Sequence, residues 1–152
     1  MKKLLKILPT LFIVILISSC TSQEDIENFI GNYEGSYHGY QRLTFGYSYE
    51  QEDFSGEETF SIIYNDDESG VLLLMDDQVI PGKVRNKKVK FETYTITTVN
   101  EENNKANTNY TMEAKLKNGE LRYGTIIEGT AVVGNSILPI DGFIEGKAKK
   151  VN

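Results

Sequence analysis

The clearest indication of the fold is the stretch Tyr110-Thr111-Met112-Glu113-Ala114-Lys115-Leu116-Lys117-Asn118-Gly119-Glu120. Its first seven residues alternate apolar and polar side chains, which is the pattern of a strand with one face buried and the other in water. Asn118-Gly119 follows, and this dipeptide readily adopts the positive φ angles of a tight hairpin turn. The stretch therefore predicts an antiparallel strand that leads into a β-hairpin.

The same period of two extends on both sides of this stretch. We expect strands over residues 33–40, 43–50, 60–64, 71–75, 78–85, 88–99, 109–117, 120–128, 130–133 and 137–148. Short turns rich in Asp, Asn, Gly and Ser separate most of them, and residues 100–107 are expected to form a long polar loop. Because about eight such strands share one apolar face, the sheet has to curl or close. The prediction is an all-β fold, an antiparallel up-and-down meander of about eight strands that closes into a small barrel.

The composition limits the chain to one ordinary domain. It has 152 residues with 16 basic and 22 acidic side chains, one histidine, one cysteine and no tryptophan, so a two-domain enzyme is excluded. Glu34, Ser36 and His38 share one face of the first expected strand, but residues two apart on a strand stand about 7 Å apart, beyond hydrogen-bond reach. We expect a protein that is not an enzyme, with no catalytic residue and no cofactor.

One acidic segment has the outline of a metal site. Residues 65–76 place oxygen-bearing side chains at positions 1, 3, 5 and 12 of a twelve-residue loop with Gly70 at position 6, as in an EF-hand calcium loop. Position 1 is Asn65, position 12 is the short Asp76, and residues 71–75 read as a strand rather than a helix. We interpret the segment as an acidic hairpin turn and expect no metal.

The N-terminal segment has the layout of a secretory signal. Three lysines precede an apolar stretch over residues 7–17, which is too short to span a bilayer comfortably. Ser18-Ser19-Cys20 ends this stretch and resembles the lipobox of bacterial lipoproteins. The resemblance implies that residues 1–19 are a signal peptide and that Cys20 is acylated, with palmitate or a related chain, and becomes the first residue after cleavage. An ordinary signal with an incidental cysteine is the alternative.

Residues 20–30 are expected to form the lipidated cysteine with a polar, acidic tether, and residues 31–152 the barrel domain. The acidic patch after Cys20 resembles the surface-export signal of Bacteroidetes lipoproteins, and Thr21 resembles an outer-membrane sorting residue of other Gram-negative bacteria. A solvated linker is an equally good interpretation. The expected location is the cell envelope, with the chain anchored through the lipid on Cys20, on the periplasmic or surface face of the outer membrane.

A second resemblance concerns the domain itself. Gly31-Asn32-Tyr33 opens the first strand, and the glycine-punctuated segment Asp141-Gly142-Phe143-Ile144-Glu145-Gly146-Lys147 lies in the last one. Together with the meander, these features resemble the lipocalin-like, or calycin-type, lipoproteins over roughly residues 30–151. The resemblance implies a barrel that binds a small apolar or amphipathic ligand, or a lipid.

Tyrosines supply the expected interior, because most of them fall on faces assigned inward and each offers apolar area with a hydroxyl that needs a partner. The candidate ligand-binding residues are Tyr33, Tyr37, Tyr47, Tyr49, Tyr64, Tyr110 and Tyr123. An eight-stranded barrel either holds one small ligand or is filled by its own side chains. A hollow interior would favour a ligand-binding lipoprotein. A filled one would favour a protein-interaction module, such as an inhibitor or an accessory subunit of an envelope complex.

Charge is divided unevenly along the chain. Residues 20–82 carry 14 acids and one base, whereas residues 83–152 carry 8 acids and 12 bases. The net charge of residues 20–152, which is −9, and the export signal argue against a nucleic-acid partner. The sharpest basic cluster consists of Lys83, Arg85, Lys87, Lys88 and Lys90. It would suit anionic lipid headgroups, lipopolysaccharide or an acidic partner, or it would simply pair with the acidic first half.

Overall fold

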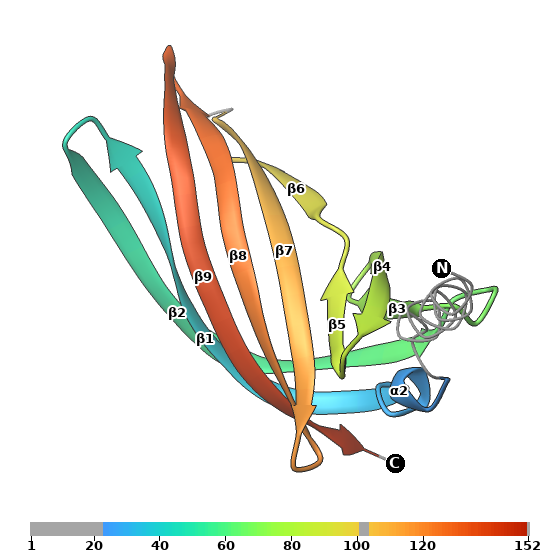
Figure 1. Cartoon of the computed structure of the whole chain (residues 1–152). Coiled ribbons are helices and arrows are strands. Elements are labelled where there is room, and N and C mark those ends of the chain that lie inside the picture. The colour runs from blue at the N-terminus through green and yellow to red at the C-terminus, as the bar shows by residue number, and fades with distance from the viewer. Residues whose placement is uncertain (1–22, 101–103, 152) are drawn as a thin grey trace, which may run out of the picture.

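The computed structural model describes residues 23–100 and 104–151. The expected signal peptide, Cys20 and Thr21 lie outside the described residues. The described part contains one short helix and nine strands (Figure 1). Their bounds are α2 Gln23–Glu27, β1 Gly31–Phe45, β2 Ser48–Tyr64, β3 Val71–Met75, β4 Gln78–Arg85, β5 Lys88–Phe91, β6 Tyr94–Val99, β7 Lys105–Lys117, β8 Glu120–Val133 and β9 Ser136–Val151.

All nine strands belong to one antiparallel sheet, in the order β5-β4-β3-β2-β1-β9-β8-β7-β6. An additional pairing joins β5 to β7. Eight strands thereby form a closed ring of hydrogen-bonded pairs, and β6 lies outside the ring along β7. The predicted all-β antiparallel meander is confirmed.

The ring is not an even barrel. The short strand β3 reaches β2 only at residues 61–64, and the short strand β5 reaches β7 only at residues 113–115, near the ends of those long strands. Beyond these pairings the long strands continue as a curved sheet, to which β6 adds one more strand (Figure 1). The molecule therefore has a closed end, beside α2, and an open end where β2 and β6 are edges. The predicted small barrel is confirmed only as a closed ring at one end.

The first hairpin lies where the sequence predicts a continuous strand. Gly46 and Tyr47 form a two-residue turn between β1 and β2, and Gly46 has a φ of +59°, which favours glycine. The predicted strand over residues 43–50 is therefore wrong. Residues 51–59, expected as an acidic stretch between strands, form part of β2. An edge strand accommodates such a run of carboxylates because most of them face solvent.

Residues 88–99, predicted as one strand, form β5 and β6, which both pair with β7. The first pair of β5 is Lys88 with Lys115, and the first pair of β6 is Tyr94 with Tyr110. Lys88 and Tyr94 are thus six positions apart, whereas their partners on β7 are only five positions apart. The additional residue is accommodated by a break between the two strands, as in a β-bulge.

The later segments follow the prediction apart from their ends. Residues 120–128 and 130–133, predicted as two strands, form the single strand β8. The polar loop predicted over residues 100–107 is shorter, because β7 begins at Lys105. The hairpin turn at Asn118-Gly119 is confirmed, and both of its residues have positive φ angles.

The short helix α2 packs against the closed end of the ring. Ile26 and Phe29 are buried in the core, and the Tyr33 hydroxyl donates a 2.8 Å hydrogen bond to the Phe29 carbonyl oxygen. Part of the predicted tether, residues 20–30, therefore belongs to the folded domain. Within the described ranges, no helix is long and apolar enough to cross a membrane.

Two groups of buried side chains hold the sheet together, both on its inner face. The group at the closed end comprises Ile26, Phe29, Tyr33, Phe60, Ile62, Val71, Leu73, Ile80, Val84, Val89, Phe91, Met112, Ala114, Leu121, Tyr123 and Ala148. The smaller group at the open end comprises Ile127, Ala131 and Ile140, with Leu43, Phe54, Ala106, Tyr110 and Ile144 packed against them. Most of the burial that stabilises the domain is therefore at the closed end.

Two inward-facing glycines make room for tyrosine rings. Tyr37 lies opposite Gly56 and Gly146, and Tyr123 also lies opposite Gly146. A Cβ atom at Gly56 would lie 2.8 Å from the Tyr37 hydroxyl oxygen, and one at Gly146 would lie 2.0 Å from Cζ of Tyr123. The rings therefore cover the backbone of the adjacent strand, which only glycine allows at these two positions.

Candidate functional site

The seven candidate tyrosines lie in three environments. Tyr33 and Tyr123 are buried in the closed end. The half-buried ones, packed against the core, are Tyr37, Tyr64 and Tyr110. Tyr47 and Tyr49 are exposed, so the prediction that they face inward is wrong. The cause is the turn at residues 46–47, which puts Tyr47 at a hairpin tip and Tyr49 on the outer face of β2.

Aromatic side chains fill the closed end. The rings of Tyr33 and Phe60 stack with their centroids 5.4 Å apart, and Phe60 meets Tyr123 edge-on at 6.0 Å. Phe29 and Phe91, both buried, complete the packing. The sequence left open whether the interior is hollow or filled by side chains. At the closed end it is filled.

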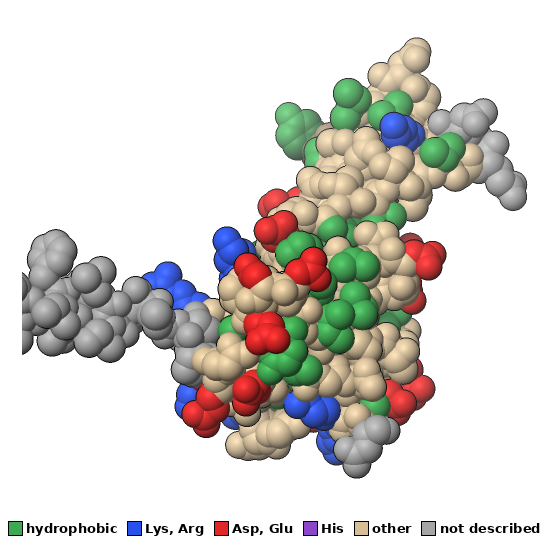
Figure 2. Space-filling model, turned by 90° about the vertical axis from the view of Figure 1, so that its right-hand side faces the viewer, with side chains coloured by type: hydrophobic (Ala, Val, Ile, Leu, Met, Phe, Trp, Pro, Cys, Tyr) green, Lys and Arg blue, Asp and Glu red, His purple; other side chains and the backbone are tan. Residues whose placement is uncertain are grey.

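Aromatic pairs also lie on the inner face of the sheet toward the open end. Tyr37 meets Phe54 edge-on at 6.4 Å, and Tyr94 stacks on Tyr110 at 5.2 Å. Tyr94 was not among the candidates, because its pairing with Tyr110 depends on the register between β6 and β7. Figure 2 shows hydrophobic side chains gathered in the middle of the molecule, with acidic side chains beside them. The middle of this side of the molecule thus presents apolar surface next to negative charge.

Glu58 brings a carboxyl group to this inner face. Its Oε1 atom is buried and has no hydrogen-bond partner among the described residues. Burial, and to a smaller extent the charge on Asp76, raises the pKa of Glu58 to about 7. Burial, Tyr110 and these same two carboxyl groups raise the pKa of Tyr94 to about 12. The sequence gives no sign of this site, because Glu58 belongs to an acidic stretch typical of solvent-exposed residues.

Replacing Glu58 by Gln is expected to change how stability depends on pH. The carboxyl has a pKa of 4.5 in the unfolded chain and about 7 in the folded one, so the folded state binds the proton more tightly. The free energy of unfolding should fall as the pH rises from 4.5 to 7, and Glu58→Gln should remove this fall. We expect the variant to be more stable at pH 8 by on the order of 2 kcal/mol and equally stable at pH 4. Urea unfolding at both pH values measures the difference, and parallel pH profiles for the two proteins would contradict it.

The single histidine is paired across strands rather than along its own strand. His38 Nε2 lies 2.8 Å from Oε1 of Glu145, and both side chains are mostly exposed. Ser55 lies opposite His38 on the other side, without a hydrogen bond between them in the described structure. The carboxylate thus comes from β9, whereas the sequence offered only Glu34 on the same strand. A base and a carboxylate in water, without a bonded nucleophile, provide only part of a catalytic set.

The acidic segment at residues 65–70 forms a hairpin turn, as predicted. The Gly70 amide donates a 3.0 Å hydrogen bond to the Asn65 side chain, and the Ser69 amide and hydroxyl donate bonds of 3.0 and 2.6 Å to Asp67. The Ser69 hydroxyl and amide hold the pKa of Asp67 below its usual value. Among the residues that the structure describes, no three His, Cys, Asp or Glu side chains gather as metal ligands.

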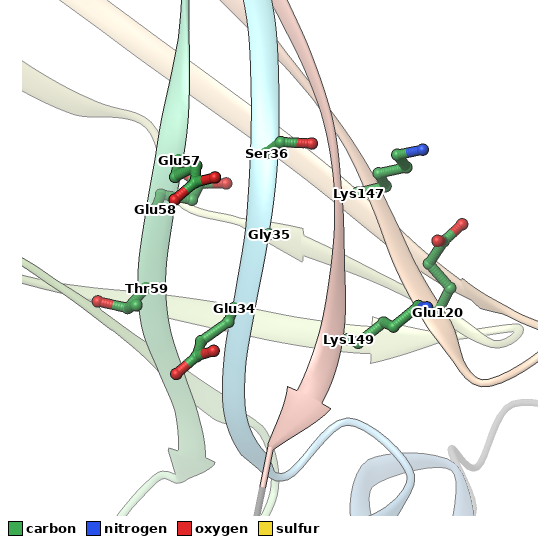
Figure 3. A pocket seen from close by; sticks show the side chains of 9 residues that line it. All are labelled: Glu34, Gly35, Ser36, Glu57, Glu58, Thr59, Glu120, Lys147 and Lys149. Carbon is green, nitrogen blue, oxygen red and sulfur yellow. The ribbon is translucent and has the colours of Figure 1, made fainter.

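A shallow pocket on the outer face is lined by charges of both signs. It has a volume of about 680 Å³ and involves β1, β2, β8 and β9 (Figure 3). Lys149 pairs across strands with Glu34 on one side and Glu120 on the other. Figure 3 shows the Lys149 side chain reaching toward Glu120. Four of the lining residues are acidic and two, Lys147 and Lys149, are basic, so the pocket offers no excess of positive charge to an anion.

No protein-family model and no curated protein matches the chain. Among solved structures, the chain is similar to the ywiB protein from Bacillus subtilis, with 10% sequence identity, 83% of this chain and 98% of that chain covered, and a TM-score of 0.36. A similarity at this level carries no argument about function. What the protein does is therefore argued below from its own residues.

Proposed function

We propose that the chain is a cell-envelope lipoprotein, not an enzyme, whose filled β domain binds a protein partner as an inhibitor or an accessory subunit of an envelope complex. The observation that carries this proposal is the packing of Tyr33, Phe60 and Tyr123 against one another at the closed end. Rings expected to line a ligand cavity instead form the core. A domain filled in this way acts through its surface.

The lipid anchor is supported by the sequence and by the place where the folded domain begins. Cys20 follows the apolar stretch 7–17 and lies three residues before Gln23, where α2 begins. Three residues span about 10 Å at most. An acyl group on Cys20 would therefore hold the closed end of the domain next to the membrane.

The surface that we propose for the partner is the open end, above all the edge strand β6. It reads Tyr94-Thr95-Ile96-Thr97-Thr98-Val99, carries no charge and, within the described structure, pairs on one side only. The opposite edge, β2, carries several carboxylates, which discourage the addition of a strand. An uncharged edge of β-branched residues is the kind to which an extended segment of another protein adds.

The intact mass of the protein isolated from membranes tests the anchor. We expect a chain that begins at Cys20 and carries the additional mass of acyl groups, and we expect Cys20→Ser to lose that mass. A chain that begins elsewhere, or an unmodified Cys20, would contradict the anchor.

Photo-cross-linking in the protein's own host tests the partner surface. A photoreactive residue replaces Ile96 on β6 or, as a control, Ile63 on β2, which are 36% and 40% exposed. We expect one protein to be joined reproducibly through position 96 and not through position 63, because only β6 offers an uncharged edge. The same products from both positions, or none from position 96, would refute the proposal.

A lipocalin-like function, the binding of a small apolar or amphipathic molecule, is the second candidate. It is supported by the buried, unpartnered Oε1 atom of Glu58 beside the stacked Tyr94 and Tyr110. A ligand with an apolar body and a hydrogen-bond donor would satisfy that oxygen. Native mass spectrometry of the protein from its own host distinguishes the two functions. A retained small molecule that is lost in Glu58→Leu would favour this candidate over a protein partner.

A further inference from the structure

Five basic residues lie directly opposite one another across five strands on the outer face. Arg85 pairs with Lys88, Lys88 with Lys115, Lys115 with Arg122, and Arg122 with Lys147. We call these five residues the basic row. Four strand spacings give it a length of about 19 Å. Only Arg85 and Lys88 belong to the cluster seen in the sequence, because the other members are brought in by strand register.

The basic row is not neutralised by the acidic half of the chain. Arg122 Nε lies 3.1 Å from Oε2 of Glu120, whereas Lys88, Lys115 and Lys147 form no ion pair with any described residue. Like charges directly opposite each other destabilise a sheet. The row therefore lowers the stability of the isolated domain. Its unpaired positive charges would be attracted to an anionic surface.

Apolar side chains lie beside the basic row on the same outer face. Ile126 and Phe143 are directly opposite each other on β8 and β9 and are 52% and 36% exposed. Together with four members of the row they line a hollow of about 780 Å³, which Gly124 leaves open because it has no side chain. Ile126 lies four positions along β8 from Arg122, about 13 Å away. We call this surface the outer wall.

Two carboxylates lie on the outer wall between the basic row and the apolar pair. Glu113 lies 3.7 Å from Lys90 Nζ, and Glu145 lies 2.8 Å from His38 Nε2. Each of these carboxylates thus contacts a side chain outside the row. Apart from these pairs, the outer wall carries positive charge. This charge lies next to exposed apolar side chains.

We propose that the outer wall lies against a lipid bilayer, with the basic row on anionic headgroups and the apolar pair at the boundary of the acyl chains. Basic residues next to exposed aromatic and aliphatic side chains are the composition of an interfacial surface. This proposal rests on the lipid anchor proposed above. A membrane suits the wall better than an acidic protein because α2 contacts β4, which ends at Arg85, and Cys20 lies three residues before α2.

Site-resolved labelling of lysines tests the proposal on the full chain. The purified protein is mixed at low salt with vesicles of phosphatidylcholine, with or without phosphatidylglycerol, and labelled briefly with an amine-reactive reagent before mass spectrometry. We expect anionic vesicles to slow the labelling of Lys88, Lys115 and Lys147 by about threefold or more. Lys105, on the same outer face at the far end of β7, should keep its rate. Equal rates with both vesicles would overturn the proposal.

A matched pair of charge reversals on β7 gives a second test. Lys115→Glu and Lys105→Glu change the net charge equally, but only Lys115 belongs to the basic row. We expect Lys115→Glu to lower the ratio of binding to anionic over zwitterionic vesicles by about twentyfold, and Lys105→Glu to change it less than about twofold. The melting temperature of Lys115→Glu should stay or rise, because the new carboxylate faces Lys88 and Arg122. Equal effects of the two variants on the ratio would refute the outer wall as the contact.

Two outcomes separate this proposal from neighbouring ones. If inorganic phosphate with phosphatidylcholine vesicles slows the three lysines as much as anionic vesicles do, the row is a site for a soluble anion and the membrane contact is wrong. The intact mass reports the acyl group independently of the labelling. An acylated chain without lysine protection refutes the outer wall alone, and protection in a chain without an acyl group supports the wall while refuting the anchor.

Discussion

Replacing Tyr33 by Ala is expected to lower the free energy of unfolding by about 3 to 5 kcal/mol. Tyr33 is buried, stacks on Phe60 with ring centroids 5.4 Å apart, and holds α2 against the ring through its hydrogen bond to the Phe29 carbonyl oxygen. Removing the ring leaves a cavity in the closed end and frees the residues that cover it. Urea unfolding followed by tyrosine fluorescence or circular dichroism measures the loss.

Two tyrosine variants serve as controls for this prediction. Tyr33→Phe keeps the ring and loses only the hydrogen bond, for which we expect about 1 kcal/mol. Tyr49→Ala removes an exposed ring from the outer face, and we expect less than about 0.5 kcal/mol. If Tyr33→Ala were no more harmful than Tyr49→Ala, the closed end would not be the packed core described above.

Replacing Gly146 by Ala is expected to destabilise the domain by about 3 kcal/mol. The new Cβ atom would lie 2.0 Å from both Cζ and the hydroxyl oxygen of Tyr123. Tyr123 is buried against Phe60, so its ring has no free space into which to move. The backbone of β9 would have to shift instead, and with it the pairing of the ring strands.

A double-mutant cycle identifies the cause of this effect. In a Tyr123→Val background the clashing ring is absent, and Gly146→Ala should then cost less than about 1 kcal/mol. Gly124→Ala is the control on the adjacent strand, because its Cβ atom would lie 3.2 Å from an atom of the exposed Phe143 ring, which can move. A full penalty for Gly146→Ala in both backgrounds would indicate a backbone requirement for glycine rather than the contact with Tyr123.

The two proposed surfaces are compatible with each other. The partner edge β6 extends toward the open end, whereas the basic row crosses the strands of the closed end, next to α2 (Figure 1). An anchored domain could rest its outer wall on the membrane while β6 remains accessible. A variant such as Lys115→Glu should therefore weaken binding to anionic vesicles without changing cross-linking through position 96.

Local patterns predicted the elements that depend on neighbouring residues. The alternation over residues 110–116 and the Asn118-Gly119 turn are features of a few consecutive side chains, and both agree with the structure. Gly46-Tyr47 was missed because the alternation of apolar residues continues through it. The consequence was large, since a misplaced turn reverses the face of every later residue of the strand, Tyr49 included.

The amino-acid sequence alone established the all-β class, the antiparallel meander and most of the turns. It also established the excess of acidic residues in the first half of the domain and of basic residues in the second. All of these depend on side chains close together along the backbone, where period two and turn chemistry act directly. Strand register was established only in the folded molecule, and register brings His38 to Glu145, Tyr94 to Tyr110 and the five bases into one row. The filling of the closed end likewise depends on rings from distant strands that share one interior. Such contacts arise from the packing of the whole chain, so no short segment encodes them.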